Sequence, residues 1–202
     1  MIKLSRLVIL ISGNGSNLQA ILDACASGEL HASVVAVISN KADAYGLVRA
    51  KNVGIESVYF PKLENESRQK YDTRLADYVS TCLPDYVILA GWMRLLSSNF
   101  LSSFSNLVIN LHPALPGMFP GTHAIQRAYD AFQRGEIHHT GVMVHLVPDE
   151  GVDNGPVLAT ETVPIHTNDT LESLEARIHE TEHHLLVDTL KHLLSKPNLQ
   201  SA

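Results

Sequence analysis

A carboxamide and an imidazole stand two residues apart at the end of a short apolar run. Residues 107–113 read Leu-Val-Ile-Asn-Leu-His-Pro, in which Val108 and Ile109 are β-branched and a proline closes the run. This composition is typical of a buried strand that ends at the rim of a sheet. Because strand side chains alternate between faces, we expect Asn110 and His112 on the same side. Together they could stabilise negative charge on a carbonyl oxygen and move a proton. Alternatively they only end the strand and bond nearby backbone, and the spacing alone does not decide.

A third polar side chain that could join them lies in an acidic loop further along the chain. Residues 148–155 read Pro-Asp-Glu-Gly-Val-Asp-Asn-Gly, and they do not match a calcium-binding loop, since the twelfth position from Asp149 is Thr160. Asp153 is a candidate partner for His112, because a carboxylate beside an imidazole fixes its tautomer and favours the imidazolium form. The alternative is a carboxylate that only faces solvent in a turn.

A glycine-bearing turn near the N-terminus suggests a different chemistry. The apolar run 7–12 leads into Ser-Gly-Asn-Gly-Ser-Asn at residues 12–17, and apolar residues then recur at helical spacing from Leu18 onward. We expect Ser16 or Asn17 to cap this helix. Backbone N–H groups at such a helix N-terminus suit a phosphate.

The turn does not match the common nucleotide-binding fingerprints. Leu18 stands where the dinucleotide motif has its third glycine, and the strand expected at 33–39 is followed by no carboxylate that would bind a ribose. No Gly-Lys-Ser/Thr follows, as it does in ATP-binding P-loops. A monophosphate ester is therefore favoured over NAD or ATP, and a tight turn that binds nothing is the alternative.

A second loop, at residues 91–96, follows the apolar run 86–89. Its backbone could read the edge of a flat heterocycle, while Trp92, Met93 and Leu95 supply apolar surface. The alternative is that Trp92 and Met93 belong to the core beneath the rim.

Strand patterns alternate with helical patterns along the chain. We expect strands at residues 7–12, 33–39, 56–59, 86–89, 107–113, 141–147 and 157–164, and helices at 18–25, 45–52, 68–82, 123–134 and after Thr170. This alternation predicts an α/β fold with one domain over residues 1–202 and a mostly parallel, Rossmann-like twisted sheet of about seven strands flanked by helices.

The same fold predicts where a ligand would bind. Ligands on parallel sheets lie beyond the carboxyl ends of the strands, so the segments that follow residues 12, 89 and 109 are expected to meet at one edge. The loop 113–121, rich in proline and glycine, is a candidate lid over that edge.

The composition limits the other partners. The 202 residues are 45% hydrophobic and carry a formal net charge of -6, which suits a packed protein and argues against a general nucleic-acid binder. The longest N-terminal apolar run, residues 7–11, is too short for a membrane span or an ordinary signal peptide. Two cysteines indicate no disulfide framework. We therefore expect a cytoplasmic protein with no nucleic-acid or membrane partner.

The last helical segment contains a motif that looks like a zinc site. Residues 179–183 read His-Glu-Thr-Glu-His, and two histidines one helical turn apart can bind zinc with the first glutamate as general base. The extended motif fails, because Leu186 and Thr189 stand where a glycine and a third histidine belong. We favour a polar helix face near the phosphate end of a pocket, and we expect no metal.

Four of these segments resemble a single family, and they occur in the family's order. They are Ser-Gly-Asn-Gly-Ser-Asn-Leu at 12–18, Ala-Gly-Trp-Met-Arg at 90–94, Asn-Leu-His-Pro at 110–113 and Asp-Asn-Gly at 153–155. Together they resemble the folate-dependent formyltransferases over about residues 5–195. The Asn-x-His-Pro segment and the later aspartate are similar to the whole family. The glycine-bearing turn is similar to the group that acts on phosphoribosylglycinamide (GAR).

The resemblance implies transfer of a formyl group from 10-formyltetrahydrofolate, a co-substrate, to the amine of GAR in purine biosynthesis. By this likeness Asn110 and protonated His112 stabilise the oxyanion, and Asp153 holds His112 and helps to move a proton to the departing folate nitrogen. The implied substrate-binding residues are Gly15, Ser16, Asn17 and His179 near the phosphate and Glu182 at the ribose. The implied pterin-binding residues are Met93, Arg94, Leu95, Leu96, Glu150, Gly151, Val152 and Asp153. No metal is implied, and we expect a monomer or a weak homodimer.

The sequence also departs from the family pattern. Residues 141–144 lack the hydroxyls that relatives often carry, His179 stands where some relatives have glutamine, and Gly151 is an extra glycine relative to a bacterial form. The nearest alternative functions are a formyltetrahydrofolate hydrolase and a tRNA-formylating enzyme, which usually carry an added domain. A catalytically silent nucleotide-binding module is the third.

Overall fold

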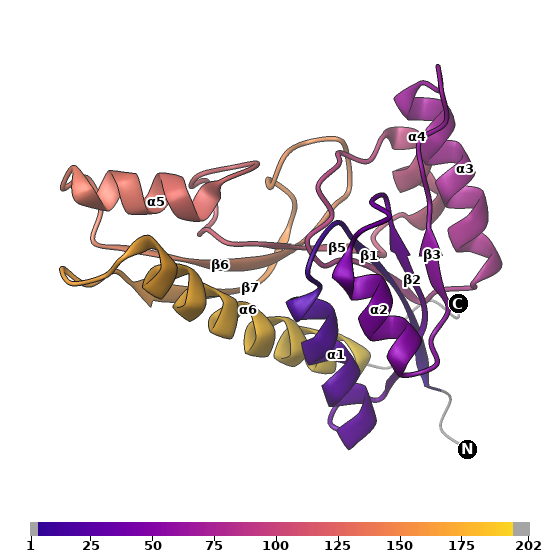
Figure 1. Cartoon of the computed structure of the whole chain (residues 1–202), viewed down its shortest axis with the longest axis horizontal. Coiled ribbons are helices and arrows are strands. Elements are labelled where there is room, and N and C mark those ends of the chain that lie inside the picture. The colour runs from indigo at the N-terminus through magenta and orange to yellow at the C-terminus, as the bar shows by residue number, and fades with distance from the viewer. Residues whose placement is uncertain (1–3, 196–202) are drawn as a thin grey trace.

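A single seven-stranded sheet runs through the computed structural model, which describes residues 4–195 (Figure 1). The strands are β1 (Ser5–Ile11), β2 (Ala32–Ser39), β3 (Ser57–Tyr59), β4 (Tyr86–Leu89), β5 (Val108–His112), β6 (His139–Leu146) and β7 (Val157–Pro164). Their order across the sheet is β3-β2-β1-β4-β5-β6-β7. Strands β1 to β5 pair in parallel, whereas β6 pairs antiparallel with both β5 and β7. The expected α/β fold with a mostly parallel sheet is confirmed. A single domain over all of residues 1–202 stays a prediction, since its ends lie outside the described residues.

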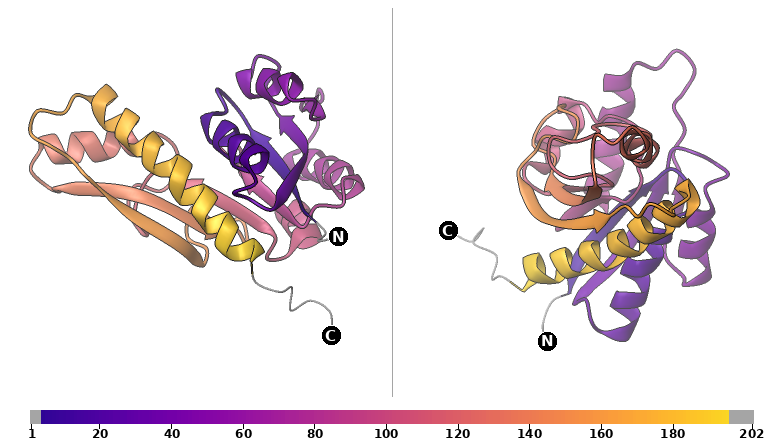
Figure 2. Two further views of the ribbon diagram at one scale, coloured as in Figure 1. Left: turned by 90° about the horizontal axis from the view of Figure 1, so that it is seen from below. Right: turned by 90° about the vertical axis from the view of Figure 1, so that its left-hand side faces the viewer.

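Helices cover both faces of the sheet (Figures 1 and 2). They are α1 (Ser16–Ser27), α2 (Tyr45–Asn52), α3 (Arg68–Thr81), α4 (Ser98–Leu101), α5 (Ala124–Gln133) and α6 (Leu171–Leu194), with a 3-10 helix at Ser102–Phe104. The sequence did not predict α4 or the 3-10 helix, because segments of four and three residues are too short to display a helical period. Among residues 4–195, no helix is long and apolar enough to cross a membrane.

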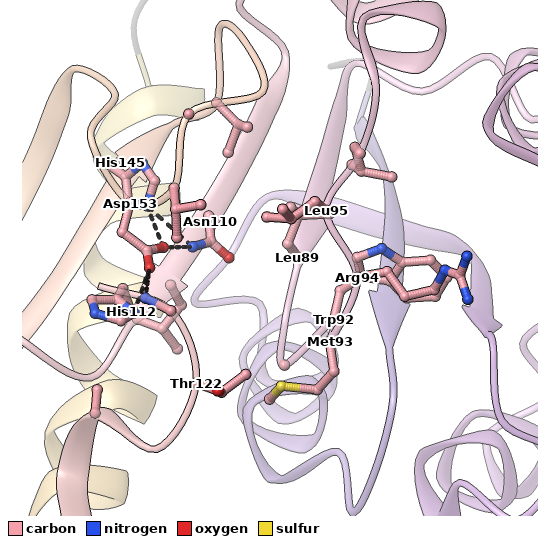
Figure 3. Close-up of a pocket in the computed structure, with 18 of the residues that line it drawn as sticks. Leu89, Trp92, Met93, Arg94, Leu95, Asn110, His112, Thr122, His145 and Asp153 are labelled. Atoms are coloured by element: carbon pink, nitrogen blue, oxygen red, sulfur yellow. Dashed lines mark hydrogen bonds and ion pairs between the residues drawn. The ribbon is translucent and has the colours of Figure 1, made fainter. Parts of the chain in front are cut away.

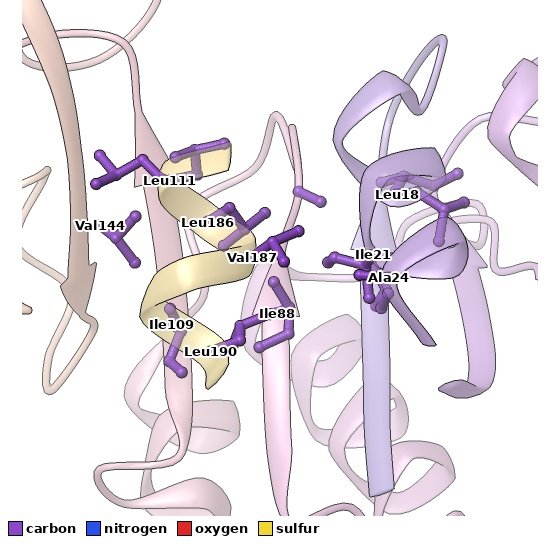
Figure 4. Close-up of a cluster of buried hydrophobic side chains, with 14 of the residues drawn as sticks. Leu18, Ile21, Ala24, Ile88, Ile109, Leu111, Val144, Leu186, Val187 and Leu190 are labelled. Atoms are coloured by element: carbon purple, nitrogen blue, oxygen red, sulfur yellow. The ribbon is translucent and has the colours of Figure 1, made fainter. Parts of the chain in front are cut away.

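Strand β1 explains why the central strands are continuous apolar runs. Leu7, Ile9 and Ile11 face one hydrophobic core, Val8 and Leu10 face another, and all five side chains are fully buried. In the first core, side chains of α1 and α6 pack onto β4 and β5 (Figure 4). The second core lies under α3 and α4. The sheet is thus held from both sides, and its strand ends are rigid supports for a site.

The starts of α1 and α6 differ in how they are capped. Gly15 is the N-cap of α1, in the left-handed conformation with φ 75°, and no side chain caps this helix. The expectation that Ser16 or Asn17 caps it is therefore wrong. A Cβ atom on Gly15 would lie 2.8 Å from the α2 backbone, so the turn requires glycine. By contrast, Thr170 and Ser173 form a reciprocal capping box at the start of α6. Within residues 4–195, the first N–H groups of α1 have no side-chain partners.

The carboxyl ends of β1, β4 and β5 lie at one edge, because the three strands are parallel neighbours. Strand β6 runs in the opposite direction and pairs His145 with Asn110 and Met143 with His112. Its first residues therefore lie beyond the end of β5. In Figure 1, β6 and β7 extend away from the parallel strands together with α5 and most of α6. This extension forms a wall beside the edge where the expected site lies.

Candidate active site

The side chains of Asn110, His112 and Asp153 converge at the end of β5 (Figure 3). Asn110 Nδ2 donates a hydrogen bond of 3.0 Å to Asp153 Oδ1. His112 Nδ1 lies 3.2 Å from the other carboxylate oxygen, Oδ2. The structure therefore brings the carboxamide and the imidazole together with a carboxylate that lies 43 positions after Asn110 in the sequence.

Asp153 is held in position by backbone as well as side chains. Its own backbone is in the left-handed region, with φ 50°, and its Oδ2 accepts a 2.7 Å hydrogen bond from the N–H of Gly121. Burial acts to raise the pKa of this carboxyl, but the hydrogen bonds from His145 and Gly121 and the nearby His112 outweigh it. The net pKa lies below its usual value, so Asp153 is ionised at neutral pH.

His112 is nearly fully buried and has an acceptor at each ring nitrogen. Beyond Asp153, its Nε2 lies 3.1 Å from the carbonyl oxygen of Phe119, which also accepts a 2.6 Å hydrogen bond from Arg127 Nη2. Burial lowers the pKa of His112, and the opposing attraction of Asp153 does not compensate. Asp153 acts as expected, because it favours the imidazolium form, but burial has the larger effect, so the net pKa of His112 lies below its usual value.

His145 completes the cluster, and the sequence analysis gave it no role. Its Nε2 lies 3.1 Å from Asn110 Nδ2 and 3.5 Å from Asp153 Oδ1. Its position opposite Asn110 depends on the antiparallel register of β5 and β6, which residue patterns do not specify. The one available signal was a histidine inside the otherwise apolar strand at residues 142–146.

A cavity of about 250 Å³ adjoins this cluster. All eight residues expected around the pterin line it, from the loop 93–96 on one side and the loop 150–153 on the other. The alternative that Trp92 and Met93 both belong to the core is correct for Trp92, which is buried in the second core. Met93 is 64% exposed and belongs to the rim. The volume is just below the range typical of sites that enclose whole drug-sized ligands, so part of such a ligand would lie outside.

Two charged residues of this rim are engaged with the protein. The guanidinium carbon of Arg94 lies 4.6 Å from the centre of the Tyr71 ring, and Figure 3 shows the side chain directed away from Asn110 and Asp153. Glu150 forms an ion pair with Arg68 and accepts a 2.9 Å hydrogen bond from the Ser98 N–H. Arg94 therefore offers its backbone to a ligand in the cavity, and Glu150 ties the loop 150–153 to helices α3 and α4.

The residues expected at the phosphate end form a second cluster, outside this cavity. Glu182 Oε2 accepts a 3.2 Å hydrogen bond from Asn17 Nδ2 and lies 2.7 Å from His179 Nδ1. This network joins α6 to the first turn of α1, where Gly15 and Ser16 present the uncapped backbone. The hydrogen bond to Glu182 raises the pKa of His179, despite the opposing effect of burial.

The His-Glu-x-x-His motif takes part in this network. His179 is paired with Glu182, and residues 4–195 contain no group of three or more His, Cys, Asp or Glu side chains that could hold a metal ion. The motif therefore gives no geometric support for a zinc site.

Comparison with known proteins identifies the family. The family model described as "Formyl transferase" matches residues 5–190. A Dictyostelium discoideum protein named "Phosphoribosylglycinamide formyltransferase" is 46% identical over 93% of this chain and 97% of its own. The Drosophila melanogaster "Trifunctional purine biosynthetic protein adenosine-3" is 41% identical over 88% of this chain and 13% of its own. The crystal structure of phosphoribosylglycinamide formyltransferase from Bacillus halodurans superimposes with a TM-score of 0.91 and 36% identity, covering 98% of this chain and 100% of that one. The chain therefore belongs to the formyl transferase family, in the group of the phosphoribosylglycinamide formyltransferases.

Proposed function

We propose that this protein transfers the formyl group of 10-formyltetrahydrofolate to the primary amine of GAR, giving formyl-GAR and tetrahydrofolate. The observation that carries the proposal is the meeting of Asn110, His112 and Asp153 beside a cavity with a largely apolar rim. Such a cluster supplies an ionised carboxylate, a titratable imidazole and a carboxamide, which are the groups that acyl transfer to an amine requires.

The folate would occupy the cavity. Exposed Met93 and Leu95 offer apolar surface to a flat ring, and the backbone of the loops 93–96 and 150–153 offers polar groups to its edge. Asn110, His112 and Asp153 also line this cavity, so a pterin ring seated in it would bring the formyl group on the adjoining N10 close to the cluster. The remainder of the folate would extend to solvent.

GAR would bind across the same edge, from the start of α1. The uncapped N–H groups of Gly15, Ser16 and Asn17 suit its phosphate, since a helix N-terminus carries partial positive charge. Asn17 Oδ1 is buried and has no donor within the described part of the chain, so a ribose hydroxyl could satisfy it. The other carboxylate oxygen of Glu182 could accept from the second hydroxyl, and His179 adds positive charge nearby.

The reaction needs one bond formed, one broken and one proton moved. The GAR amine attacks the formyl carbon, a C–N bond forms, and the bond from that carbon to folate N10 breaks. The amine loses a proton and N10 gains one, and Asp153 and His112 are placed to carry it. His112 Nε2 contacts the Phe119 carbonyl in this structure, so it becomes available to the formyl oxygen only when the loop 113–123 releases that contact.

The test is formation of formyl-GAR by purified protein from 10-formyltetrahydrofolate and GAR, without added metal. We expect one tetrahydrofolate released for each GAR formylated. Folate turnover that does not depend on GAR would contradict the proposal and indicate a hydrolase. Inhibition by a chelator would contradict the absence of a metal. We further propose that the protein acts in the cytoplasm as a monomer or weak homodimer, without a nucleic-acid or membrane partner.

A further inference from the structure

Helix α2 packs directly against the glycine-bearing turn at the start of α1. The two backbones approach so closely that a Cβ atom on Gly15 would lie 2.8 Å from the Cα atom of Gly46. The N–H of Gly46 donates a 3.2 Å hydrogen bond to the carbonyl oxygen of Gly13. The first turn of α2 therefore supports residues 13–15, and glycine on both sides makes this close contact possible.

Arg49, one helical turn after Tyr45 in α2, holds the same turn with its guanidinium group. Its Nε donates a 2.9 Å hydrogen bond to the backbone carbonyl oxygen of Asn14, and its Nη2 donates one of 2.9 Å to the Asn14 side-chain oxygen. Its Nη1 donates a 3.1 Å hydrogen bond to Gln19 Oε1, near the start of α1. The guanidinium carbon lies 4.9 Å from the centre of the Tyr45 ring. One half-buried cation therefore joins α2, the turn and α1.

The bond to the Asn14 carbonyl oxygen determines where the next N–H points. A trans peptide is planar, so the C=O of one residue and the N–H of the next point in opposite directions, and residues 4–195 contain no cis peptide. Because Asn14 O is bonded to Arg49, the N–H of Gly15 points away from α2. The bond from Gly46 to Gly13 directs the Asn14 N–H in the same way. Within the described part of the chain, no backbone carbonyl accepts from the Gly15 N–H.

We propose that Arg49 is a positioning residue for the phosphate of GAR: it holds the Asn14 carbonyl oxygen and so directs the Gly15 N–H toward the phosphate. This inference rests on the proposed function and assigns the side chain that prepares the turn before the substrate arrives. A donor that is already fixed loses little conformational freedom when the ligand binds, so the affinity is higher. The hydrogen bond from the guanidinium also polarises the peptide, which makes its N–H a stronger donor.

Two variants of equal side-chain length test this role. In Arg49→Gln the amide nitrogen stands as many bonds from Cα as Nε does, so it can still donate to the Asn14 carbonyl oxygen, but it carries no charge. In Arg49→Met a methyl group takes that place and no donor remains. We expect R49M to raise KM for GAR by about 10- to 100-fold, with kcat and the KM for folate within about 3-fold of wild type. R49Q should keep KM for GAR within about 3-fold.

The matched control is Lys51→Met, which removes a positive charge from an exposed position of the same helix. It should leave KM for GAR within about 2-fold of wild type, as is usual for exposed sites. Equal rises of KM in R49M and R49Q would show that Arg49 acts through its charge alone. A near-normal KM in R49M would show that the turn does not need Arg49. Either result would overturn the proposal.

Backbone amide NMR with inorganic phosphate gives a readout that does not need turnover. In the wild type and in R49Q, phosphate should shift the Gly15 amide resonance and slow its hydrogen exchange. In R49M the Gly15 resonance should already differ in the free protein, and the Kd for phosphate should rise at least about 10-fold. An equal Kd in R49M, or no shift of Gly15 in the wild type, would refute the role of Arg49. Should the wild type fail to formylate GAR, the proposed function falls, while the phosphate titration still decides whether Arg49 positions the turn.

Discussion

Replacing Asp153 by asparagine removes one charge at the centre of the cluster with almost no change in shape. The carboxylate serves the Asn110 amide at 3.0 Å and the Gly121 N–H at 2.7 Å through different oxygens. An asparagine has one acceptor oxygen, so whichever way it turns, one of these donors faces an NH2 group. The substitution also removes the attraction that holds the pKa of His112 up, so burial lowers that pKa further.

The size of the effect can be worked out from these contacts. A hydrogen bond to a charged group contributes about 1.5–3 kcal/mol, and we expect Asp153→Asn to lose about that much unfolding free energy. Loss of a proton-transfer group typically lowers kcat by about 10²- to 10⁴-fold, or roughly 3–5 kcal/mol of barrier. The catalytic loss should therefore exceed the loss of stability.

The assay is steady-state formylation of GAR together with urea unfolding of the same samples. Asp130→Asn is the matched control, since it removes an exposed carboxylate from α5 that accepts a hydrogen bond from the Gln126 side chain and lies outside the cluster. It should leave kcat within about 2-fold of wild type, as is usual for exposed sites. A kcat for Asp153→Asn within about 5-fold of wild type would refute the assignment of proton transfer to this carboxylate.

Three further predictions concern the phosphate cluster, the buried imidazole and the loop before α6. Asn17→Ala should raise KM for GAR about 10-fold at nearly unchanged kcat, because a binding contact rather than a reacting group is lost; an unchanged KM would contradict it. Burial lowers the pKa of His112 in the folded protein below its unfolded value of about 6.5. As pH falls below that value, the unfolded chain binds the proton first, so the free energy of unfolding decreases until pH reaches the folded pKa. His112→Gln should flatten that part of the stability curve in urea unfolding between about pH 7 and 5, and an unaltered slope would count against it. Asp169→Asn, which breaks a two-pronged pairing with Arg177, should lower the unfolding free energy by about 1–3 kcal/mol and leave kcat unaffected; equal thermal stability would contradict it.

The fold was largely predictable because the central strands of the sheet are buried on both faces. Continuous apolar runs such as Leu7–Ile11 and the glycines at turns identify strands and their ends without any knowledge of packing. The direction of each strand relative to its neighbour was harder to predict. The strand at 107–113, the helix at 123–134 and the strand at 141–147 have the pattern of a parallel crossover, yet β6 runs antiparallel to β5. A strand's own sequence contains little information about the direction of its neighbour.

The site was predictable where it depended on chemistry and not where it depended on register. The types and spacing of Asn110 and His112 identified a reactive strand end, and Asp153 was a candidate by charge alone. His145 could be found only once its register opposite Asn110 was known. The contacts of the Asn110 amide could not be predicted either, because its two partners, His145 and Asp153, come from different elements.

The antiparallel course of β6 explains how a distant aspartate reaches the end of β5. Strand β6 begins beyond His112 and runs back along β5, so the N–H of Val147 bonds to the carbonyl oxygen of Val108, near the start of that strand. The loop 148–156 must then double back before β7 begins beside His145, and Asp153 adopts φ 50° within it. A side chain on this returning loop can contact the face of β5 that carries Asn110 and His112, although the loop is not a strand of the sheet. The carboxylate therefore reaches the cluster from a loop that also lines the cavity, so a ligand bound against this loop would contact the same segment that holds Asp153 beside His112.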